Sequence, residues 1–123
     1  ANSGGAPGRT RVNVIMITFA DFEKVEMRVG RITAVHDFPE ARKPAYKLTL
    51  DFGPYGIKQS SAQVTNYQKE ELLGRLIVAV TNFPPKQVGK FKSEVLVLGA
   101  INADDTVILL KPDDGAELGS PIA

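Results

Sequence analysis

The sequence predicts an all-β fold, a small closed sheet of short strands with one helix inserted among them. Several segments alternate between apolar and polar residues with a period of two, which is typical of strands that have one buried face. The 11 glycines and 8 prolines fall largely between these segments, where they indicate turns. One stretch after the third strand instead carries residues that begin and end a helix.

The composition is that of one domain whose core needs no disulfide or metal. The 123 residues are 43% hydrophobic and include no cysteine, which excludes disulfides and thiolate metal sites and is compatible with a reducing cytosol. No apolar run approaches the roughly 20 residues of a membrane-spanning helix, and no signal-peptide pattern opens the chain. We therefore expect a soluble, unexported protein without membrane insertion. Because the net charge is only +1, local clusters of basic residues would have to bind any anionic partner.

The N-terminus divides into a tail and the start of the domain. Residues 1–11 are small, Gly-rich and poor in apolar side chains, so we expect a flexible tail followed by a single domain over residues 12–123. Thr18 to Lys24 has a capping-box-like start and predicts a brief helix. Phe19 and Phe22 would anchor that helix.

The first strands are predicted over residues 27–35 and 46–52. The apolar alternation of the first slips by one residue after Gly30, which a bulge in a curled strand would produce and which favours a barrel. Residues 46–52 alternate without interruption. A Gly-Pro-Tyr-Gly turn at residues 53–56 then leads to a third strand, residues 57–62, whose side chains are unusually polar.

A short helix is predicted next, at Asn66–Leu73, with Thr65 or Asn66 as its cap and Gly74 as its terminating residue. Further strands are expected at residues 75–81, 93–101 and 106–110. These elements match an OB-fold, a five-stranded Greek-key barrel that commonly places an element between its third and fourth strands. Residues 113–123 would form a C-terminal extension. A split β-sandwich remains the alternative.

No group of residues predicts catalysis. His36 is the sole histidine, and no motif places a serine beside it, so a nucleophilic triad has no support. Ser60 and Ser93 are better interpreted as hydrogen-bonding groups than as nucleophiles. Two Asp-Asp pairs lie in turn-like sequence and lack the ligand spacing of a calcium loop. We therefore expect a protein that is not an enzyme and that uses no metal or cofactor.

A basic and aromatic binding face is predicted instead, built from loops at one end of the barrel. Cations beside aromatic side chains suit single-stranded nucleic acid, and they suit extended peptides equally well. Scattered solubilising charge is the alternative, but it does not explain why the charged loops also carry phenylalanine and proline. The predicted face consists of Arg42, Lys43, Lys58, Ser60, Asn82, Phe83, Lys86, Phe91, Lys92 and Ser93.

The chain also resembles a known family. The similarity lies in DFEKVEMRVGRI, FPEARKPAYKL, TNFPPKQVGKFKSEVLVLGA and the C-terminal DGAELGSPI. These segments are similar to the CsaA-type chaperones of the tRNA-binding-domain family, an OB-fold also appended to methionyl- and phenylalanyl-tRNA synthetases. The resemblance implies a cytoplasmic homodimer that acts in protein export and binds unfolded preproteins and the translocation ATPase SecA. Together with their peripheral position, it makes Phe19, Phe22, Leu118 and Ile122 the predicted dimer interface.

Two departures from the wider family bear on the ligand. Where tRNA-binding members usually carry His-Pro-Asn-Ala-Asp-Lys-Leu, residues 38–44 read Phe-Pro-Glu-Ala-Arg-Lys-Pro. The family's Ser-x-Gly-Met segment aligns with residues 93–96, which keep the serine and lose the glycine and methionine. This pattern favours a peptide-binding export chaperone over a tRNA-binding protein, which stays the alternative.

Overall fold

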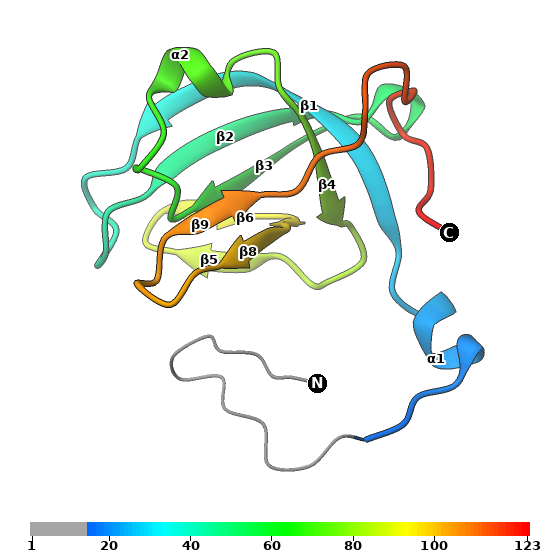
Figure 1. The fold of residues 1–123 in the computed structure, drawn as a ribbon. Helices are drawn as coiled ribbons and strands as arrows, with labels where there is room; N and C mark the ends of the chain where they lie inside the picture. The colour runs from blue at the N-terminus through cyan, green and yellow to red at the C-terminus, as the bar shows by residue number, and fades with distance from the viewer. Residues whose placement is uncertain (1–14) are drawn as a thin grey trace.

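A curved five-stranded antiparallel sheet forms the body of the molecule (Figure 1). The computed structural model describes residues 15–123, so the predicted tail at residues 1–11 lies outside the described residues. The strand order is β3-β2-β1-β4-β7, which forms a nearly closed OB-like barrel and confirms the predicted fold. Its strands are β1 (Met27–Asp37), β2 (Tyr46–Asp51), β3 (Ile57–Ala62), β4 (Leu76–Val80) and β7 (Leu96–Val97).

Two hairpins and three short helical segments complete the described chain. One hairpin joins β5 (Lys86–Val88) to β6 (Phe91–Ser93), and the other joins β8 (Gly99–Ile101) to β9 (Val107–Leu109). The helical segments are α1 (Phe19–Glu23), the 3-10 turn η1 (Gly53–Tyr55) and α2 (Lys69–Leu72). No helix among residues 15–123 is long and apolar enough to cross a membrane.

Strand β1 bends because it pairs with two different strands along its length. Its first half pairs with β4 and its second half with β2, and the register with β2 shifts between Ile32 and Ala34. The bulge predicted at Gly30 therefore lies later in the strand. Gly30 is needed for packing instead, since a Cβ there would lie 2.7 Å from Cε1 of Phe52, a side chain that is fully buried in the core.

Helix α2 is shorter than the predicted Asn66–Leu73. It begins at Lys69, and Asn66 lies before it, where its Nδ2 donates to the Val107 carbonyl at 3.2 Å. Gln68 is the N-cap, and its backbone N–H donates to Oε1 of Glu71 at 2.7 Å. The fully buried Leu72 fixes this single turn to the barrel core.

The strand predicted at residues 93–101 is broken into β6, β7 and β8, so this prediction was wrong. Only part of its apolar run is covered, because Val95 is buried whereas Leu96 is 49% exposed. Gly99 allows β9 to approach β8 closely, since a Cβ there would lie 2.5 Å from Cγ1 of Val107 on β9. The residues that leave the core become available to line a surface.

The C-terminal extension pairs with β1. The Gly119 N–H donates to the Val29 carbonyl at 2.8 Å, and the Val29 N–H donates to the Ser120 carbonyl at 3.0 Å. Arg28 reinforces this contact, because its Nη1 donates to the Gly119 carbonyl at 2.8 Å and its guanidinium lies 3.7 Å from the centre of the Tyr55 ring. The segment therefore extends the sheet along the start of β1.

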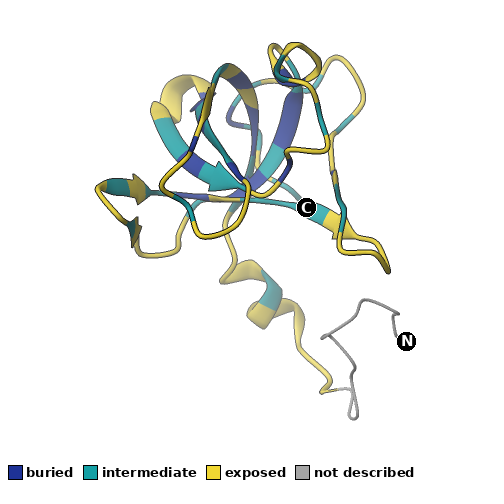
Figure 2. Cartoon of the chain, turned by 90° about the vertical axis from the view of Figure 1, so that its left-hand side faces the viewer, coloured by how far each residue is buried: buried dark blue, intermediate teal, exposed yellow. Residues whose placement is uncertain are grey.

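Helix α1 projects from the barrel (Figure 2). The predicted capping box is confirmed: the Asp21 N–H donates to Oγ1 of Thr18 at 3.1 Å, and the Thr18 N–H donates to the Asp21 carboxylate at 3.0 Å. No residue of α1 is buried within the described chain, and Phe19 is 71% exposed. A helix this short needs packing to be stable, yet within residues 15–123 Phe19 stays largely uncovered and Phe22 is half-buried.

Candidate binding groove

A groove of about 1320 Å³ lies between the two hairpins and the loop that follows β1. Figure 1 shows β5 and β6 beside β8 and β9 on one side of the barrel. The loop at residues 38–45 and the end of β3 supply the other walls. The groove is therefore built from segments far apart in the sequence, and four of the predicted binding residues line it: Arg42, Lys43, Lys86 and Ser93.

Three cations stand around the groove. Arg42 and Lys43 come from the loop after β1 and Lys86 from β5, and all three are exposed. Among the described residues, no salt bridge joins any of them to a carboxylate, and Glu40 is the one acidic residue of the lining. Their charge is thus available to a bound ligand.

The rest of the groove is largely apolar. Val95 and Leu109 are buried at its base, where they also belong to the barrel core. Leu96 is 49% and Ile101 is 38% exposed, and both belong to the lining. An apolar surface bordered by cations is suited to side chains of an extended chain.

The predicted aromatic residues do not form an open platform. The Phe91 ring packs edge-on against Phe38, with their centres 5.3 Å apart, and Phe38 is buried. Nζ of Lys47 lies 5.3 Å from the centre of the Phe38 ring and 5.7 Å from that of Phe91. This cluster fixes the loop after β1 against the β5–β6 hairpin. Phe83 is 54% exposed but lies outside the groove lining.

The hydroxyls of Ser60 and Ser93 form hydrogen bonds to the backbone of the barrel. Ser60 is 1% exposed, and its Oγ donates to the Val95 carbonyl at 2.7 Å. Oγ of Ser93 accepts from the Ser61 N–H at 3.2 Å. Ser60 therefore supports the groove wall from behind and cannot touch a ligand in the groove, which corrects its predicted role.

Asn82 lies at another end of the barrel. Its Oδ1 accepts from the Glu26 N–H at 3.0 Å and its Nδ2 donates to the Lys24 carbonyl at 2.7 Å, so it ties the end of β4 to the segment before β1. The neighbouring Thr81 hydroxyl donates to the Glu26 carboxylate at 2.7 Å, and Nε of Arg28 donates to the same carboxylate. Both hydrogen bonds lower the pKa of Glu26, and the one from Thr81 has the larger effect. Both polar groups of the Asn82 side chain are therefore used in hydrogen bonds within the protein.

The last two predicted cations, Lys58 and Lys92, are also outside the groove lining. Lys58 is half-buried on β3, and Lys92 is exposed on β6 opposite Gln87. The structure thus places four of the ten predicted residues in the groove lining and the other six outside it.

Comparison with known proteins identifies the family. A sequence profile described as putative tRNA binding domain matches residues 27–121, which is most of the chain. A crystal structure of CsaA chaperone protein from Picrophilus torridus is 60% identical, covers 88% of this chain and all of its own, and superposes with a TM-score of 0.83. The chain is a CsaA-like member of the tRNA-binding-domain family.

Other relatives fit the same family. The chaperone CsaA of Bacillus anthracis is 49% identical, with a TM-score of 0.84 over 89% of this chain and all of its own. Methionine–tRNA ligase 1 of Sorangium cellulosum is 42% identical over 103 residues, which are 83% of this chain. The CsaA-like chain spans only 14% of that ligase's length.

Sequence reasoning missed the apolar half of this CsaA-like groove. Leu96, Leu98, Ile101 and Val107 all belong to the lining. The signal was present as an apolar run interrupted by Gly99, but a run of that kind is also typical of a fully covered strand. Within the described part of the chain, no three His, Asp or Glu side chains gather in a way that could hold a metal ion.

Proposed function

We propose that this CsaA-like protein is a non-enzymatic chaperone that binds extended, unfolded protein segments in the groove. The observation that supports it best is the pairing of exposed apolar side chains, Leu96 and Ile101, with three cations that have no salt-bridge partner among the described residues. Apolar contacts bind many different sequences without selecting for any one of them. The cations add a preference for segments with acidic residues. Similarity to two proteins described as CsaA chaperones supports the same role.

The partners follow from the same resemblance. We propose that the segments are those of preproteins on their way to export, that SecA is the partner that receives them, and that the protein works in the cytoplasm. Catalysis has no part in this proposal, because capture and release of a chain need only reversible contact.

Transfer RNA is the second candidate ligand, favoured by the profile match to residues 27–121. Phosphate contacts and apolar capture differ in their response to salt. If tRNA is bound through the groove cations, its affinity for the protein should fall steeply between roughly 50 and 200 mM salt, because each phosphate contact releases counterions from the RNA. Affinity for an unfolded preprotein should change much less.

The variant Lys86→Ala sharpens this test. Loss of one phosphate contact should lower the slope of log affinity against log salt for tRNA by about one. Gel-shift titrations measure the tRNA slope, and fluorescence anisotropy with a labelled, unfolded preprotein measures the peptide affinity. The exposed Lys24, which lies outside the groove, supplies the charge-matched control Lys24→Ala. An unfolded preprotein that fails to bind at any salt concentration would contradict the chaperone proposal.

We propose further that the protein is a homodimer in which α1 is covered by the second copy. Phe19 lies 71% exposed, and Ile15, Met16 and Ile17 before it are between 66% and 87% exposed. The predicted interface residues Phe22, Leu118 and Ile122 are each half-buried, so they retain surface for a partner. A self-complementary patch of this kind is what a two-fold dimer requires.

Light scattering tests the dimer. The parent should have twice the 13.3 kDa mass of one chain at micromolar concentration, and Phe19→Asp should shift it toward the single-chain mass because a charge would be buried in the interface. Leu73→Asp is the matched control, since Leu73 is 51% exposed at the end of α2 and should leave the mass unchanged. A single-chain mass for the parent would contradict the proposal.

A further inference from the structure

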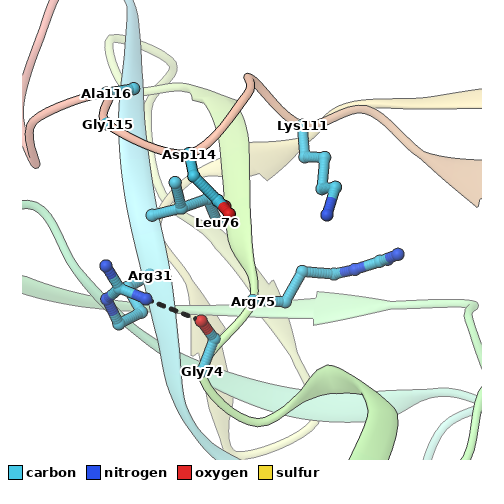
Figure 3. Close-up of a pocket in the computed structure, with 8 residues that line it drawn as sticks. All are labelled: Arg31, Gly74, Arg75, Leu76, Lys111, Asp114, Gly115 and Ala116. Atoms are coloured by element: carbon cyan, nitrogen blue, oxygen red, sulfur yellow. Dashed lines mark hydrogen bonds between the residues drawn. The ribbon is translucent and has the colours of Figure 1, made fainter.

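A second pocket, of about 420 Å³, lies outside the groove (Figure 3). It is enclosed by the middle of β1, the segment that joins α2 to β4 and the loop after β9. It shares no lining residue with the groove. The proposed function therefore leaves it without a role. Its lining is Arg31, Gly74, Arg75, Leu76, Lys111, Asp114, Gly115 and Ala116.

The charge around this pocket is unbalanced. Arg31, Arg75 and Lys111 bring three positive charges and Asp114 one negative charge, which leaves a net charge of +2. Within residues 15–123, none of these four side chains takes part in a salt bridge. Figure 3 shows the Lys111 side chain pointing toward that of Arg75. Cations that share a small pocket repel one another, and an anion between them would remove that repulsion.

The two arginines are held in place and retain free donors. Nη1 of Arg31 donates to the Gly74 carbonyl at 2.8 Å, which fixes the guanidinium at the edge of the pocket (Figure 3) and leaves its other N–H groups without hydrogen-bond partners within residues 15–123. The Arg75 guanidinium lies 5.1 Å from the centre of the Tyr67 ring, and its Nη1 is buried without a hydrogen-bond partner in the described chain. This Nη1 has almost no solvent-accessible surface and does not face the open pocket, so the remaining N–H groups of the half-buried Arg75 are the donors that a ligand could reach.

We propose that this pocket binds a phosphate group. A phosphate presents several acceptor oxygens at once, and guanidinium donors match them better than they match a spherical anion such as chloride. Inorganic phosphate and the backbone of an RNA both supply this chemistry. The site acts separately from the groove, because the two have no residue in common.

Titration with sodium phosphate at constant ionic strength, followed by NMR shifts of the pocket amides with chloride as the reference anion, tests the site. Lys111→Ala should weaken phosphate binding about five- to tenfold, because one exposed cation of the pocket is lost. Asp114→Asn should tighten binding by a similar factor, because the one opposing charge is removed. Both side chains are exposed, so neither change disturbs the core. Lys24→Ala, which removes an exposed lysine outside the pocket, should leave phosphate binding unchanged.

Two further measurements identify the source of the phosphate and distinguish binding in this pocket from binding in the groove. If RNA supplies it, Lys111→Ala should also lower the salt slope of tRNA binding by about one. If the slope is unchanged while the phosphate titration responds as stated, the ligand is free phosphate. Lys86→Ala should alter groove binding and leave the phosphate titration unchanged. Absence of phosphate-specific shifts, or equal losses in Lys111→Ala and Lys24→Ala, would overturn the proposal.

Discussion

Replacing Phe52 with alanine should lower the free energy of unfolding by about 3–5 kcal/mol, because the ring is fully buried among the barrel strands and its removal leaves a cavity. Chemical denaturation followed by circular dichroism measures the change. The residue follows directly after β2 and faces β1, so its loss affects the two strands that make the most extensive contacts in the sheet.

The same ring should be coupled to Gly30. Gly30→Ala alone should cost about 1–3 kcal/mol, because the added methyl group would lie 2.7 Å from Cε1 of Phe52. In the Phe52→Ala background the methyl enters free space, so that cost should largely disappear, giving a coupling energy of about 1–3 kcal/mol.

Gly89 provides the control for this cycle. It has a φ of +60° in the β5–β6 turn with no atom within 4 Å of an added Cβ, so Gly89→Ala costs only backbone strain. That cost should be the same with and without the Phe52 ring. Equal costs of Gly30→Ala in both backgrounds would show that the ring does not require the glycine.

Leu96→Asp should weaken binding of an unfolded preprotein by at least about tenfold, because it places a charge in the apolar lining of the groove. Fluorescence anisotropy with a labelled preprotein segment measures the loss. The protein itself should remain folded, since Leu96 is 49% exposed and its backbone pairing with Val80 is kept.

Leu73→Asp makes an equivalent change elsewhere on the surface. Leu73 is 51% exposed, close to the value for Leu96, and does not line the groove. The two variants thus differ in position and hardly in chemistry. Equal affinity of Leu96→Asp and the parent, with both folded and in the same oligomeric state, would exclude the groove as the capture site.

Strand β2 is predictable from the sequence because it places alternate side chains in the core, and β4 because its run Leu76–Val80 is apolar throughout. Leu48 and Leu50 of β2 are fully buried, while Lys47 and Thr49 between them are only half-buried. The division of the predicted strand at residues 93–101 is not predictable in the same way. The three pieces have different partners, since β6 pairs with β5, β7 with β4 and β8 with β9, and these pairings exist only once all the strands are in place.

The candidate groove shows the same limit of prediction from local sequence. Arg42, Lys43 and Lys86 could be proposed because loop cations are visible locally in the sequence, and the structure places all three in the lining of one groove, whose ligand stays a proposal. Ser60 and Asn82 have equally polar side chains, yet their partners are 35 and 56 residues away in the chain, so their structural use cannot be seen from composition. The dimer interface and the tRNA alternative stay predictions.

The C-terminal segment covers an edge of β1 that would otherwise be open to strand pairing. Where β1 pairs with β4 at residues 27–31, its opposite edge has no strand from the barrel, and residues 119–122 occupy that edge through bonds to Met27 and Val29 and a bridge between Arg28 and Pro121. An uncovered edge would offer unpaired N–H and C=O groups to any other extended chain. The bound C-terminus therefore leaves residues 27–31 of β1 without a free edge for strand pairing with another chain.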